Sequence, residues 1–437
     1  MTSDHPRIWI DTTTLLRTFR HGPGRVTGIP RVVCECIREA RKDEAIRERI
    51  KFCFASEASW SISEMFLDEV DRLVAVTEAE IVYKASFRDL FRRFLPPGII
   101  ERLSRIEEMS RRASGKLRGG LRKVSSNEAA SHPFSDRDVW VNLGCWWHES
   151  LPDLMKDIRL TVGVRTVVTI HDCMPLALPQ FFPLEQVRLW QGGVNALQSS
   201  TDQILAVSEN TKRDVSRYLP NLEGNVTTFH LGDNFLRSPI KPRAQSDLNR
   251  IGLSEPYVLM VGTIEARKNH ILVVKTWREL LGSGAKLPKL VFAGKWGWKV
   301  DSLVDEIAGL QSEGDHLRII EGPTDTELAA LYHGAMFTVF PSKYEGWGLP
   351  VRESLFYGRI CIAAKNSAIT EASDGLADEF ESDSQAELTR VILKYLDPVK
   401  RCKREAEIQS RFQVTDWEMT WTQIKAILQK ELSKGRQ

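Results

Sequence analysis

The sequence predicts an α/β protein of two domains, each built on a parallel β-sheet covered by helices. Three observations support this prediction: a length of 437 residues, short apolar or β-branched runs that recur along the chain, and helix-like stretches between them. Because one hydrophobic core rarely serves more than about 250 to 300 residues, the length favours two domains. Alternating strand and helix patterns are typical of βαβ units, which build parallel sheets.

The predicted strands are nearly continuous hydrophobic runs, as expected for parallel strands that are covered on both faces. They lie at residues 7–11 (RIWID), 138–144 (DVWVNLG), 165–172 (RTVVTIHD), 203–208 (QILAVS), 257–263 (YVLMVGT), 289–295 (KLVFAGK), 317–320 (LRII) and 336–342 (MFTVFPS). In open sheets of this kind, ligands bind beyond the carboxyl ends of the strands. The residues just after each run are therefore the first candidates for a site.

Two stretches break the alternation and set the domain boundaries. Residues 233–256 are rich in Pro, Ser and charge and are interpreted as an interdomain linker. Residues 88–124 carry eleven Arg or Lys against four Asp or Glu and contain apolar residues at helical spacing. We expect an amino-terminal domain over 1–240 with a basic helical insertion at about 85–130, a carboxyl-terminal domain over 250–405, and a carboxyl-terminal helix over 406–437.

The basic stretch at 88–124 has two interpretations that the sequence leaves open. A basic amphipathic segment can lie on an anionic membrane, gaining about 1 kcal/mol per basic residue near the lipid. A solvated helical insertion explains the same pattern equally well.

Composition excludes several classes of function. The net charge of +2 indicates no polyanionic partner, so nucleic acid is not expected. No apolar run approaches the 18 or so residues that cross a bilayer, and the start of the chain lacks the pattern of a signal peptide, so we expect a cytoplasmic protein. The seven cysteines form no C-x-x-C pair, which argues against a disulfide framework and against a zinc cluster.

The segment at residues 340–364 is the most informative part of the chain. A Gly-x-Gly pair, Gly346 and Gly348, lies between a predicted strand and a predicted helix. Glycines there let backbone N–H groups approach a phosphate near the positive end of a helix, although tight turns also need glycine for steric reasons. Glu345 and Glu353 flank the turn and could accept hydroxyls of a sugar and a ribose. Two exposed glutamates are the simpler alternative.

Carboxylates beside an anion-binding turn would repel phosphates unless cations compensate for them. Arg267 and Lys268 follow the strand at 257–263 and could supply that charge. Arg binds phosphate in a bidentate manner and Lys acts as a point charge, so the pair could stabilise a departing nucleoside diphosphate.

These blocks together resemble the retaining glycosyltransferases of family 4, which have the GT-B fold. The resemblance covers residues 255–375, in the order VGTIEARKNH, KLVFAGKWGW, TDTELAALYHGAMFTVFPSKYEGWGLPVRESLFYG and NSAITEASDG. It implies two Rossmann-like domains that face each other across a cleft, with a carboxyl-terminal helix that packs back toward the amino-terminal domain. The chain departs from the common family pattern at Val351–Leu355 and at Gly358–Cys361, and neither departure removes a glutamate of the motif.

The resemblance also assigns donor-binding roles to individual residues. It implies that Glu345 lies near hydroxyls of the donor sugar, that Glu353 binds the ribose, and that Arg267 and Lys268 hold the diphosphate. The backbone at Gly262, Gly346, Gly348 and Leu349 completes the predicted donor site. No metal and no cofactor are expected, since the family generally needs none and no acidic D-x-D cation site lies near these blocks.

The amino-terminal half matches the family less closely. The block at 166–183 (TVVTIHDCMPLALPQFFP) is similar to family members that build bacterial polysaccharides, and the resemblance implies that His171 lies beside the reacting centre, with Asp172 on the acceptor side. A capped turn is the alternative for these two residues. The loop at 20–33 suggests Gly28 and Arg31 on the acceptor side, unless it is an ordinary surface loop. Trp146 and Trp147 could stack on a sugar or pack in the core.

The resemblance implies a retaining, metal-independent hexosyltransferase with His171, Arg267, Lys268 and Glu345 as the catalytic residues. We expect GDP-mannose as donor and a glycan or a polyprenyl-diphosphate-linked oligosaccharide as acceptor, in bacterial surface-polysaccharide synthesis at the inner face of the cytoplasmic membrane. A GT-B epimerase or phosphorylase, or a sugar-nucleotide binder without activity, are the alternatives. A dehydrogenase is disfavoured, because no G-x-G-x-x-G opens the first βα unit.

Overall fold

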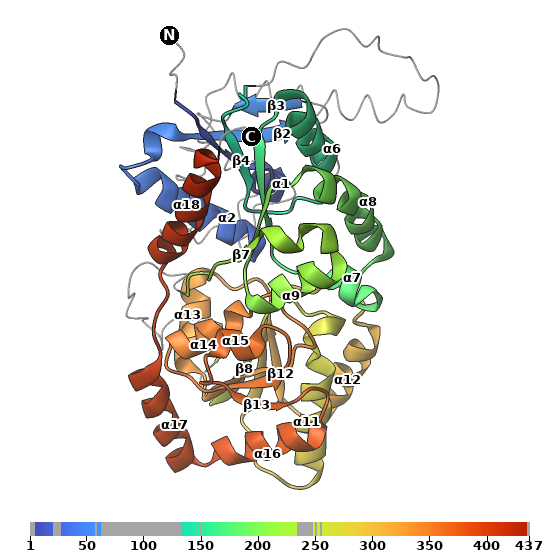
Figure 1. Cartoon of the computed structure of the whole chain (residues 1–437). Helices are drawn as coiled ribbons and strands as arrows, with labels where there is room; N and C mark the ends of the chain where they lie inside the picture. Colours follow the sequence, from blue (N-terminus) through green and yellow to red (C-terminus); the bar gives the residue numbers. More distant parts are fainter. Residues whose placement is uncertain are drawn as a thin grey trace, which may run out of the picture.

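The computed structural model describes residues 5–20, 28–56, 59–62, 133–148, 150–233, 248–249, 251–253 and 256–434. Two sheets flanked by helices lie one above the other in this part of the chain (Figure 1). The predicted insertion at about 85–130, with its basic stretch 88–124, lies outside the described residues, as does most of the predicted linker at 233–256.

The amino-terminal domain has a seven-stranded sheet in the order β3-β2-β1-β4-β5-β6-β7, in which only the β2–β3 pair is antiparallel. Its strands are β1 (Ile8–Asp11), β2 (Ile50–Ser56), β3 (Ser59–Ile62), β4 (Val139–Asn142), β5 (Arg165–Ile170), β6 (Gln203–Ala206) and β7 (Val226–Thr228). Its helices are α1 (Thr13–Arg20), α2 (Ile29–Lys42), α6 (Leu151–Asp157), α7 (Met174–Ala177), α8 (Leu184–Ser200) and α9 (Glu209–Tyr218).

The carboxyl-terminal domain has a six-stranded parallel sheet in the order β10-β9-β8-β11-β12-β13. Its strands are β8 (Tyr257–Val261), β9 (Lys289–Ala293), β10 (Leu317–Ile320), β11 (Phe337–Phe340), β12 (Cys361–Lys365) and β13 (Asp378–Glu381). Its helices are α11 (His270–Gly282), α12 (Asp301–Ser312), α13 (Asp325–Gly334), α14 (Leu349–Phe356), α15 (Ile369–Ser373), α16 (Gln385–Leu396) and α17 (Pro398–Arg411). This doubly wound order is Rossmann-like, as predicted.

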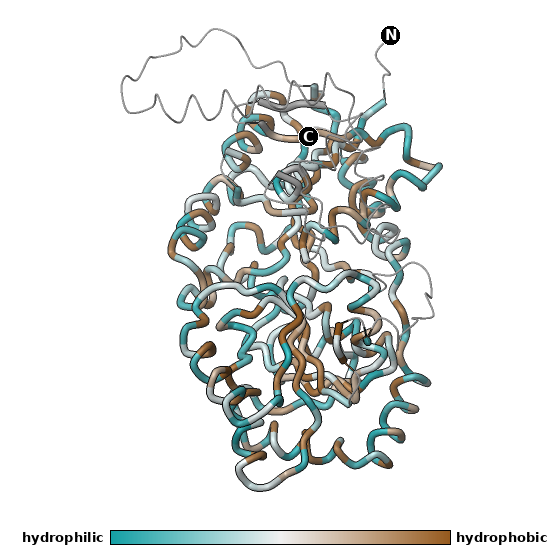
Figure 2. Tube along the Cα trace, turned by 180° about the vertical axis from the view of Figure 1, so that it is seen from behind, coloured by the Kyte–Doolittle hydropathy of each residue, from teal (hydrophilic) through white to brown (hydrophobic). Residues whose placement is uncertain are grey.

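The strands lie where the hydrophobic runs predicted them. All eight predicted strands are present, and the core strands are almost fully buried, which is why they are apolar at successive positions. Figure 2 shows the sheet of the carboxyl-terminal domain as a bundle of hydrophobic strands at the centre of the fold. The hydrophobic effect therefore fixes both sheets, and it places the carboxyl ends of their strands on the two sides of the domain boundary.

The last helix, α18 (Trp417–Ser433), belongs to the amino-terminal domain in space. Trp421, Ile424 and Leu428 are buried in the same hydrophobic cluster as Ile8 and Val141. Figure 1 shows α18 beside α2, on the far side of the boundary from α17. The prediction of a terminal helix that packs back on the amino-terminal domain is confirmed. The predicted boundary at 405 falls within α17, and the structure places the return crossing at residues 412–416.

The chain thus crosses between the domains twice, and the two crossings are bonded to each other. The Asp233 N–H donates to the Thr415 carbonyl at 2.8 Å, and the Thr415 N–H donates to Asp233 Oδ2 at 2.7 Å. Arg352 of α14 donates from Nε to Asp233 Oδ1 at 2.7 Å, and the aspartate is 2% exposed. One buried carboxylate therefore ties both crossings to the carboxyl-terminal domain.

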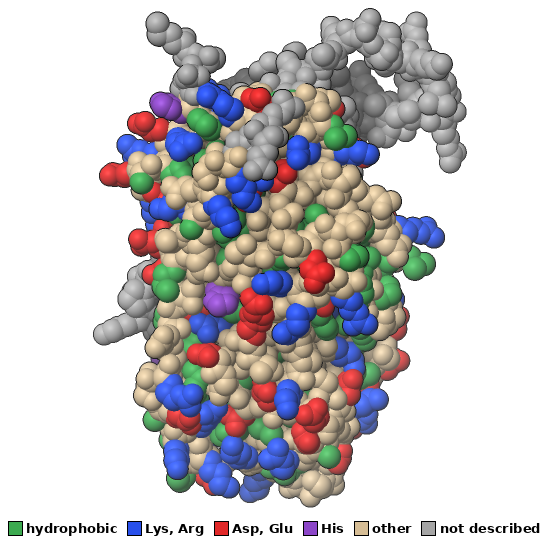
Figure 3. Space-filling model, in the orientation of Figure 1, with side chains coloured by type: hydrophobic (Ala, Val, Ile, Leu, Met, Phe, Trp, Pro, Cys, Tyr) green, Lys and Arg blue, Asp and Glu red, His purple; other side chains and the backbone are tan. Residues whose placement is uncertain are grey.

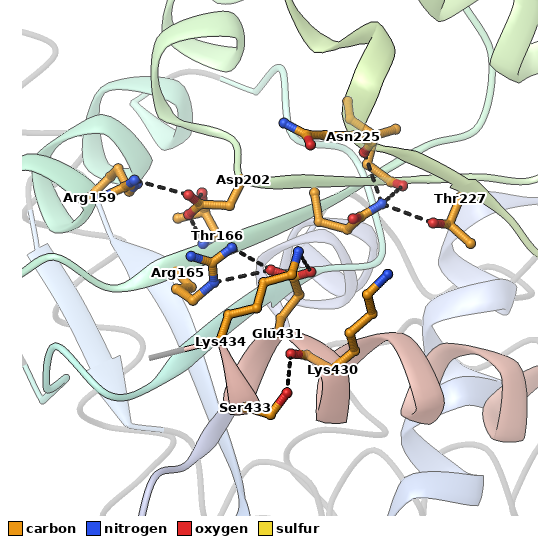
Figure 4. Close-up of polar contacts among 12 residues, drawn as sticks. Arg159, Arg165, Thr166, Asp202, Asn225, Thr227, Lys430, Glu431, Ser433 and Lys434 are labelled. Atoms are coloured by element: carbon orange, nitrogen blue, oxygen red, sulfur yellow. Dashed lines mark hydrogen bonds and ion pairs between the residues drawn. The ribbon is translucent and has the colours of Figure 1, made fainter. Parts of the chain in front are cut away.

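The far end of α18 is held by a buried carboxylate (Figure 4). Glu431 is fully buried, and its Oε2 accepts from Arg165 Nε at 3.0 Å while its Oε1 accepts from Lys434 Nζ at 2.6 Å. Arg165 is the first residue of β5, so the ion pair joins the helix to the sheet beneath it.

Replacing Glu431 with alanine should lower the free energy of unfolding by about 2 to 3 kcal/mol, because Arg165 loses the partner of a buried ion pair. The expected loss of unfolding free energy is smaller than for a fully buried ion pair, because the Arg165 side chain is 24% exposed and can be hydrated in the variant. Urea unfolding would measure the difference. Gln429→Ala, at an exposed position of the same helix, is the control and should change stability by less than about 0.5 kcal/mol. Equal stabilities of the two variants would contradict the role given to the ion pair.

Candidate active site in the interdomain cleft

A cleft of about 360 Å³ lies where the carboxyl ends of the two sheets face each other. It is lined by residues from both domains. Every residue predicted for the donor site or for the acceptor side lines this cleft, except the two tryptophans: Gly28, Arg31, His171, Asp172, Gly262, Arg267, Lys268, Glu345, Gly346, Gly348, Leu349 and Glu353. The fold therefore brings together residues that are more than 300 positions apart in the sequence.

The floor of the cleft is a cluster of charged side chains around Glu345. Its Oε1 accepts from Arg267 Nη1 at 2.8 Å, from Lys268 Nζ at 2.6 Å and from Ser342 Oγ at 2.5 Å. All three charged residues are buried, with exposed fractions of 7%, 8% and 7% for Arg267, Lys268 and Glu345. The cations that the sequence required beside the carboxylate are therefore in direct contact with it.

The ion pairs fix the charge of this carboxylate. Burial alone would raise the pKa of Glu345, but Arg267 and Lys268 outweigh that effect and lower the pKa to about 2. Arg267 also donates from Nη2 to Glu265 Oε1 at 2.6 Å. Two cations and two carboxylates thus balance, and Glu345 is an ionised hydrogen-bond acceptor at every pH at which proteins are usually studied.

Further positive charge comes from other walls of the cleft. Arg31 on α2 lines it and pairs with Asp325 Oδ2 of the opposite domain at 3.1 Å. Lys295 follows β9 and is exposed at the opening. A diphosphate would therefore meet Arg31 and Lys295 in addition to the charges on the floor.

Glu353 lines the same cleft from α14. Its Oε2 accepts from the Tyr332 hydroxyl at 2.6 Å, which orients the carboxylate from below. The separation of Glu345 and Glu353 along the chain places one at the tip of the loop and the other one helical turn inside. Both glutamates line the cleft, as predicted.

The two glycines between them meet different steric demands. Gly348 has φ of +114° at the N-cap of α14, a backbone conformation that side chains disfavour. A Cβ on Gly346 would lie 1.8 Å from the His171 carbonyl oxygen and 3.1 Å from Asp172 Cβ. Gly348 therefore permits the turn into the helix, whereas Gly346 permits backbone contact between the two domains.

His171 is held in one tautomer. Its Nε2 lies 2.9 Å from the Leu143 carbonyl oxygen, which can only accept, so Nε2 carries the proton and Nδ1 is left as an acceptor. Burial lowers the pKa of His171 to about 4, partly offset by that hydrogen bond. The neighbouring Asp172 has a pKa raised to about 6, chiefly by burial, and its Oδ1 caps the turn by accepting from the Met174 N–H at 2.9 Å. Asp172 thus has the capping role that the sequence left open, at a position that lines the cleft.

Neutral His171 makes stability depend on pH with a definite sign. Its folded-state pKa lies below the ordinary value of 6.5, so the unfolded chain binds a proton that the folded chain does not as the pH falls from 6.5 toward 4. Relative to a His171→Gln variant, the wild-type protein should lose about 2 kcal/mol of unfolding free energy between pH 7 and pH 5. Urea titrations of both proteins at the two pH values would measure this, and a constant difference would contradict the neutral assignment.

Trp146 and Trp147 do not reach the cleft. They are 0% and 8% exposed and pack edge to face against each other at 5.8 Å between ring centroids, with Trp190 of α8 beside them. Rings buried on all sides cannot offer a face to a sugar. The structure corrects the sugar-stacking hypothesis and supports core packing for both residues.

Several residues of the site were not predicted. Lys295, Gly322 and Trp347 line the cleft, and Tyr332 supports Glu353 from beneath it. Lys295 ends a predicted strand run, so the rule that ligands bind beyond strand ends could have found it. Tyr332 lies within α13 and has no local sequence signal, because its role depends on packing against α14.

Within the described ranges, no three His, Cys, Asp or Glu side chains are grouped so that they could hold a metal ion. In the same part of the chain, every helix is too short or too polar to cross a lipid bilayer. Figure 3 shows Lys and Arg interspersed with Asp and Glu over one face of both domains, in agreement with the net charge of +2.

Comparison with protein families and curated proteins gives a consistent result. Residues 244–407 match the family model described as "Glycosyl transferases group 1". Serotype-specific mannosyltransferase WbdA of Escherichia coli is 26% identical over 316 residues, which cover 68% of this chain and 37% of that protein. O-antigen chain mannosyltransferase B of Escherichia coli is 28% identical over 211 residues, which cover 47% of this chain and 55% of that protein. The chain therefore spans less than two thirds of the length of these relatives.

Solved structures share the architecture over almost the whole chain. Sucrose-phosphate synthase from Thermosynechococcus elongatus has a TM-score of 0.62 at 16% identity, covering 98% of this chain and 100% of the other. HepE from Anabaena, in complex with UDP and glucose, has a TM-score of 0.59 at 12% identity with the same coverage. At these identities the likeness shows the fold alone. The predicted GT-B arrangement of two Rossmann-like domains is confirmed.

Proposed function

Residues 244–407 carry a glycosyl transferases group 1 domain, and from that premise we propose that this chain transfers a hexose from a nucleotide-sugar to a glycan acceptor. The carboxyl-terminal domain would hold the donor, and the amino-terminal domain would present the acceptor hydroxyl. The proposed reaction retains the anomeric configuration of the sugar and needs no metal ion.

One observation carries the proposal: the buried contact of Arg267 and Lys268 with Glu345 at the floor of a cleft between two Rossmann-like domains. In this cluster a sugar hydroxyl can donate to Glu345, while the cations lie where negative charge grows on a leaving diphosphate. Charges that are already in place in a site that excludes water stabilise the negative charge of this transition state more strongly than the same charges would in water.

The reaction step follows from this placement. The acceptor hydroxyl oxygen forms a bond to the anomeric carbon of the donor while the bond from that carbon to the diphosphate oxygen breaks. The proton of the acceptor passes to the leaving diphosphate on the same face of the sugar, so no protein carboxylate need act as nucleophile. Glu345 is unsuited to that role, since its pKa of about 2 and its ion pairs make it a weak base. His171, neutral with Nδ1 free to accept, would contact the reacting sugar.

We assign GDP-mannose as the donor and a polyprenyl-diphosphate-linked oligosaccharide as the acceptor. The assignment is supported by the names of the two curated relatives described above, a serotype-specific mannosyltransferase and an O-antigen chain mannosyltransferase. Such an acceptor would place the enzyme at the inner face of the cytoplasmic membrane, with the basic stretch 88–124 as the proposed contact with anionic lipid. The acceptor would meet the side of the cleft formed by Gly28, Arg31, His171 and Asp172.

A panel of nucleotide-sugars tests this proposal. The purified protein is incubated with GDP-mannose, UDP-glucose or UDP-galactose, with and without a polyprenyl-diphosphate oligosaccharide, and nucleoside diphosphate and glycan product are measured. Acceptor-dependent release of GDP with an α-linked mannose in the product is expected. Conversion of the donor without acceptor would indicate an epimerase, consumption of phosphate a phosphorylase, and binding without turnover an inactive binder. No calorimetric binding of any sugar nucleotide or free nucleotide would overturn the proposal.

A further inference from the structure

The loop that carries Glu345 is docked on the amino-terminal domain through the first two turns of α9 and its N-cap. The docking side chains on that domain are Ser208, Asn210, Thr211 and Asp214, which we call the α9 dock. Ser208 Oγ donates to the Gly346 carbonyl at 2.7 Å, and Thr211 Oγ1 donates to the same oxygen at 3.3 Å. The loop backbone is thus bonded across the cleft on one side of Glu345.

On the other side of Glu345, the side chain of Tyr344 enters the same dock. Its hydroxyl donates to Asp214 Oδ2 at 2.5 Å and accepts from Asn210 Nδ2 at 2.9 Å. The ring packs beside Met174, Phe182 and Val187, a small hydrophobic cluster of the amino-terminal domain. Both the polar tip and the apolar body of this tyrosine therefore belong to the interface between the domains.

The backbone of Tyr344 is also part of the donor site. Its carbonyl oxygen accepts from Arg267 Nη1 at 2.5 Å, and the same Nη1 donates to Glu345 Oε1 at 2.8 Å. One residue thus contacts the charged floor of the cleft through its backbone and the opposite domain through its side chain. A shift of Tyr344 would move Arg267 and Glu345 relative to His171.

We propose that Tyr344 is a positioning residue, which through its hydrogen bonds to Asp214 and Asn210 sets the Arg267–Glu345 pair against the amino-terminal half of the active site. The role rests on the proposed function, but the contacts that support it do not. Asp214 is 9% exposed, and burial raises the pKa of the Tyr344 hydroxyl, so the tyrosine stays protonated and remains the donor.

Tyr344→Phe removes the two hydrogen bonds and keeps the ring in its apolar cluster, so the variant should fold. Its kcat should fall about tenfold while KM for the sugar nucleotide changes less than about threefold, because the nucleotide is held within one domain whereas the reaction needs both. Tyr395→Phe is the matched control: the Tyr395 hydroxyl donates to Asp378 Oδ1 inside the carboxyl-terminal domain, away from the cleft. It should transfer sugar like the wild-type protein.

Asp214 supplies a second, independent test. Asp214→Asn keeps an oxygen that can accept from Tyr344 and should retain most of the activity, whereas Asp214→Ala should match Tyr344→Phe. The double variant Tyr344→Phe/Asp214→Ala should be no slower than either single variant, because the two groups act as one unit. Additive losses, or full activity of Tyr344→Phe, would overturn the inference and leave the proposed function standing.

The arrangement of the domains can also be measured without any substrate. Small-angle X-ray scattering should give a larger radius of gyration for Tyr344→Phe than for Tyr395→Phe, since the variant has lost contacts that hold the domains together. Identical curves would overturn the positioning role even if the chain proved to have no transferase activity. Failure of the wild-type protein to bind any nucleotide would instead overturn the proposed function.

Discussion

Alanine in place of Lys268 is expected to lower the turnover of sugar transfer by about 100-fold to 1,000-fold, the effect of removing one preorganised group that stabilises charge in a transition state. Lys268 is buried at the floor of the cleft and its Nζ lies 2.6 Å from Glu345 Oε1, so the variant loses a cation at this position. Arg267 and Ser342 still bond Glu345 in the variant, and for that reason the fold should persist.

The assay for this variant is kcat with a saturating sugar nucleotide, beside circular dichroism and thermal unfolding. Lys275→Ala is the control, because Lys275 lies on the helix that follows Lys268, is half exposed and forms a long ion pair with Glu306 at 3.8 Å. Its turnover should equal that of the wild-type protein. Normal turnover of a folded Lys268→Ala protein would exclude Lys268 from stabilising the leaving group.

Gly346→Ala is expected to lower the turnover of sugar transfer by about 100-fold. The loss would come from displacement of the loop that carries Glu345, because the substitution removes no reacting group. The new Cβ would lie 1.8 Å from the His171 carbonyl oxygen, and a backbone atom cannot rotate away as a flexible side chain can. Either the loop withdraws from the α9 dock or the domains separate. In both cases Glu345 and His171, which line the same cleft, shift relative to each other.

Gly192→Ala is the control for this substitution. Gly192 lies within α8, and a Cβ there meets no atom within 4 Å, so alanine should leave activity unchanged and should stabilise the helix slightly. Nucleotide binding to Gly346→Ala, measured by calorimetry, should be weakened less than turnover. Wild-type activity of Gly346→Ala would mean that the contact between Gly346 and His171 is not made in the reacting protein.

The core strands were predictable because burial on both faces leaves a continuous apolar signature. The strands that the sequence did not reveal lie toward the edges or carry polar residues. β13 (Asp378–Glu381) reads DEFE, with only Phe380 buried, and β7 has no fully buried residue. Their positions are set by pairing with a neighbouring strand that is already formed, so local sequence carries little of the information.

The candidate site was predictable to the extent that its residues follow strands. His171, Arg267 and Glu345 all lie in segments that follow a strand, at the edge of each sheet that borders the cleft. The hydrogen bonds that hold the site residues were not predictable: the Leu143 carbonyl accepts from His171 Nε2, and the Tyr332 hydroxyl donates to Glu353. Such contacts depend on how helices and loops pack. The packing of Trp146 and Trp147 could not be predicted either. A pair of tryptophans looks the same in sequence whether it packs in a core or faces a ligand.

The place of α18 has a consequence for how the protein is made. The amino-terminal domain is not one continuous stretch of chain, because Trp421, Ile424 and Leu428 complete its interior from the far end of the sequence. The ribosome therefore has to translate the whole carboxyl-terminal domain before the core of the amino-terminal domain can be completed. The carboxyl-terminal domain is continuous from β8 to α17, so it can fold first during synthesis. Until α18 is made, the apolar surface that this helix covers on the amino-terminal domain stays exposed.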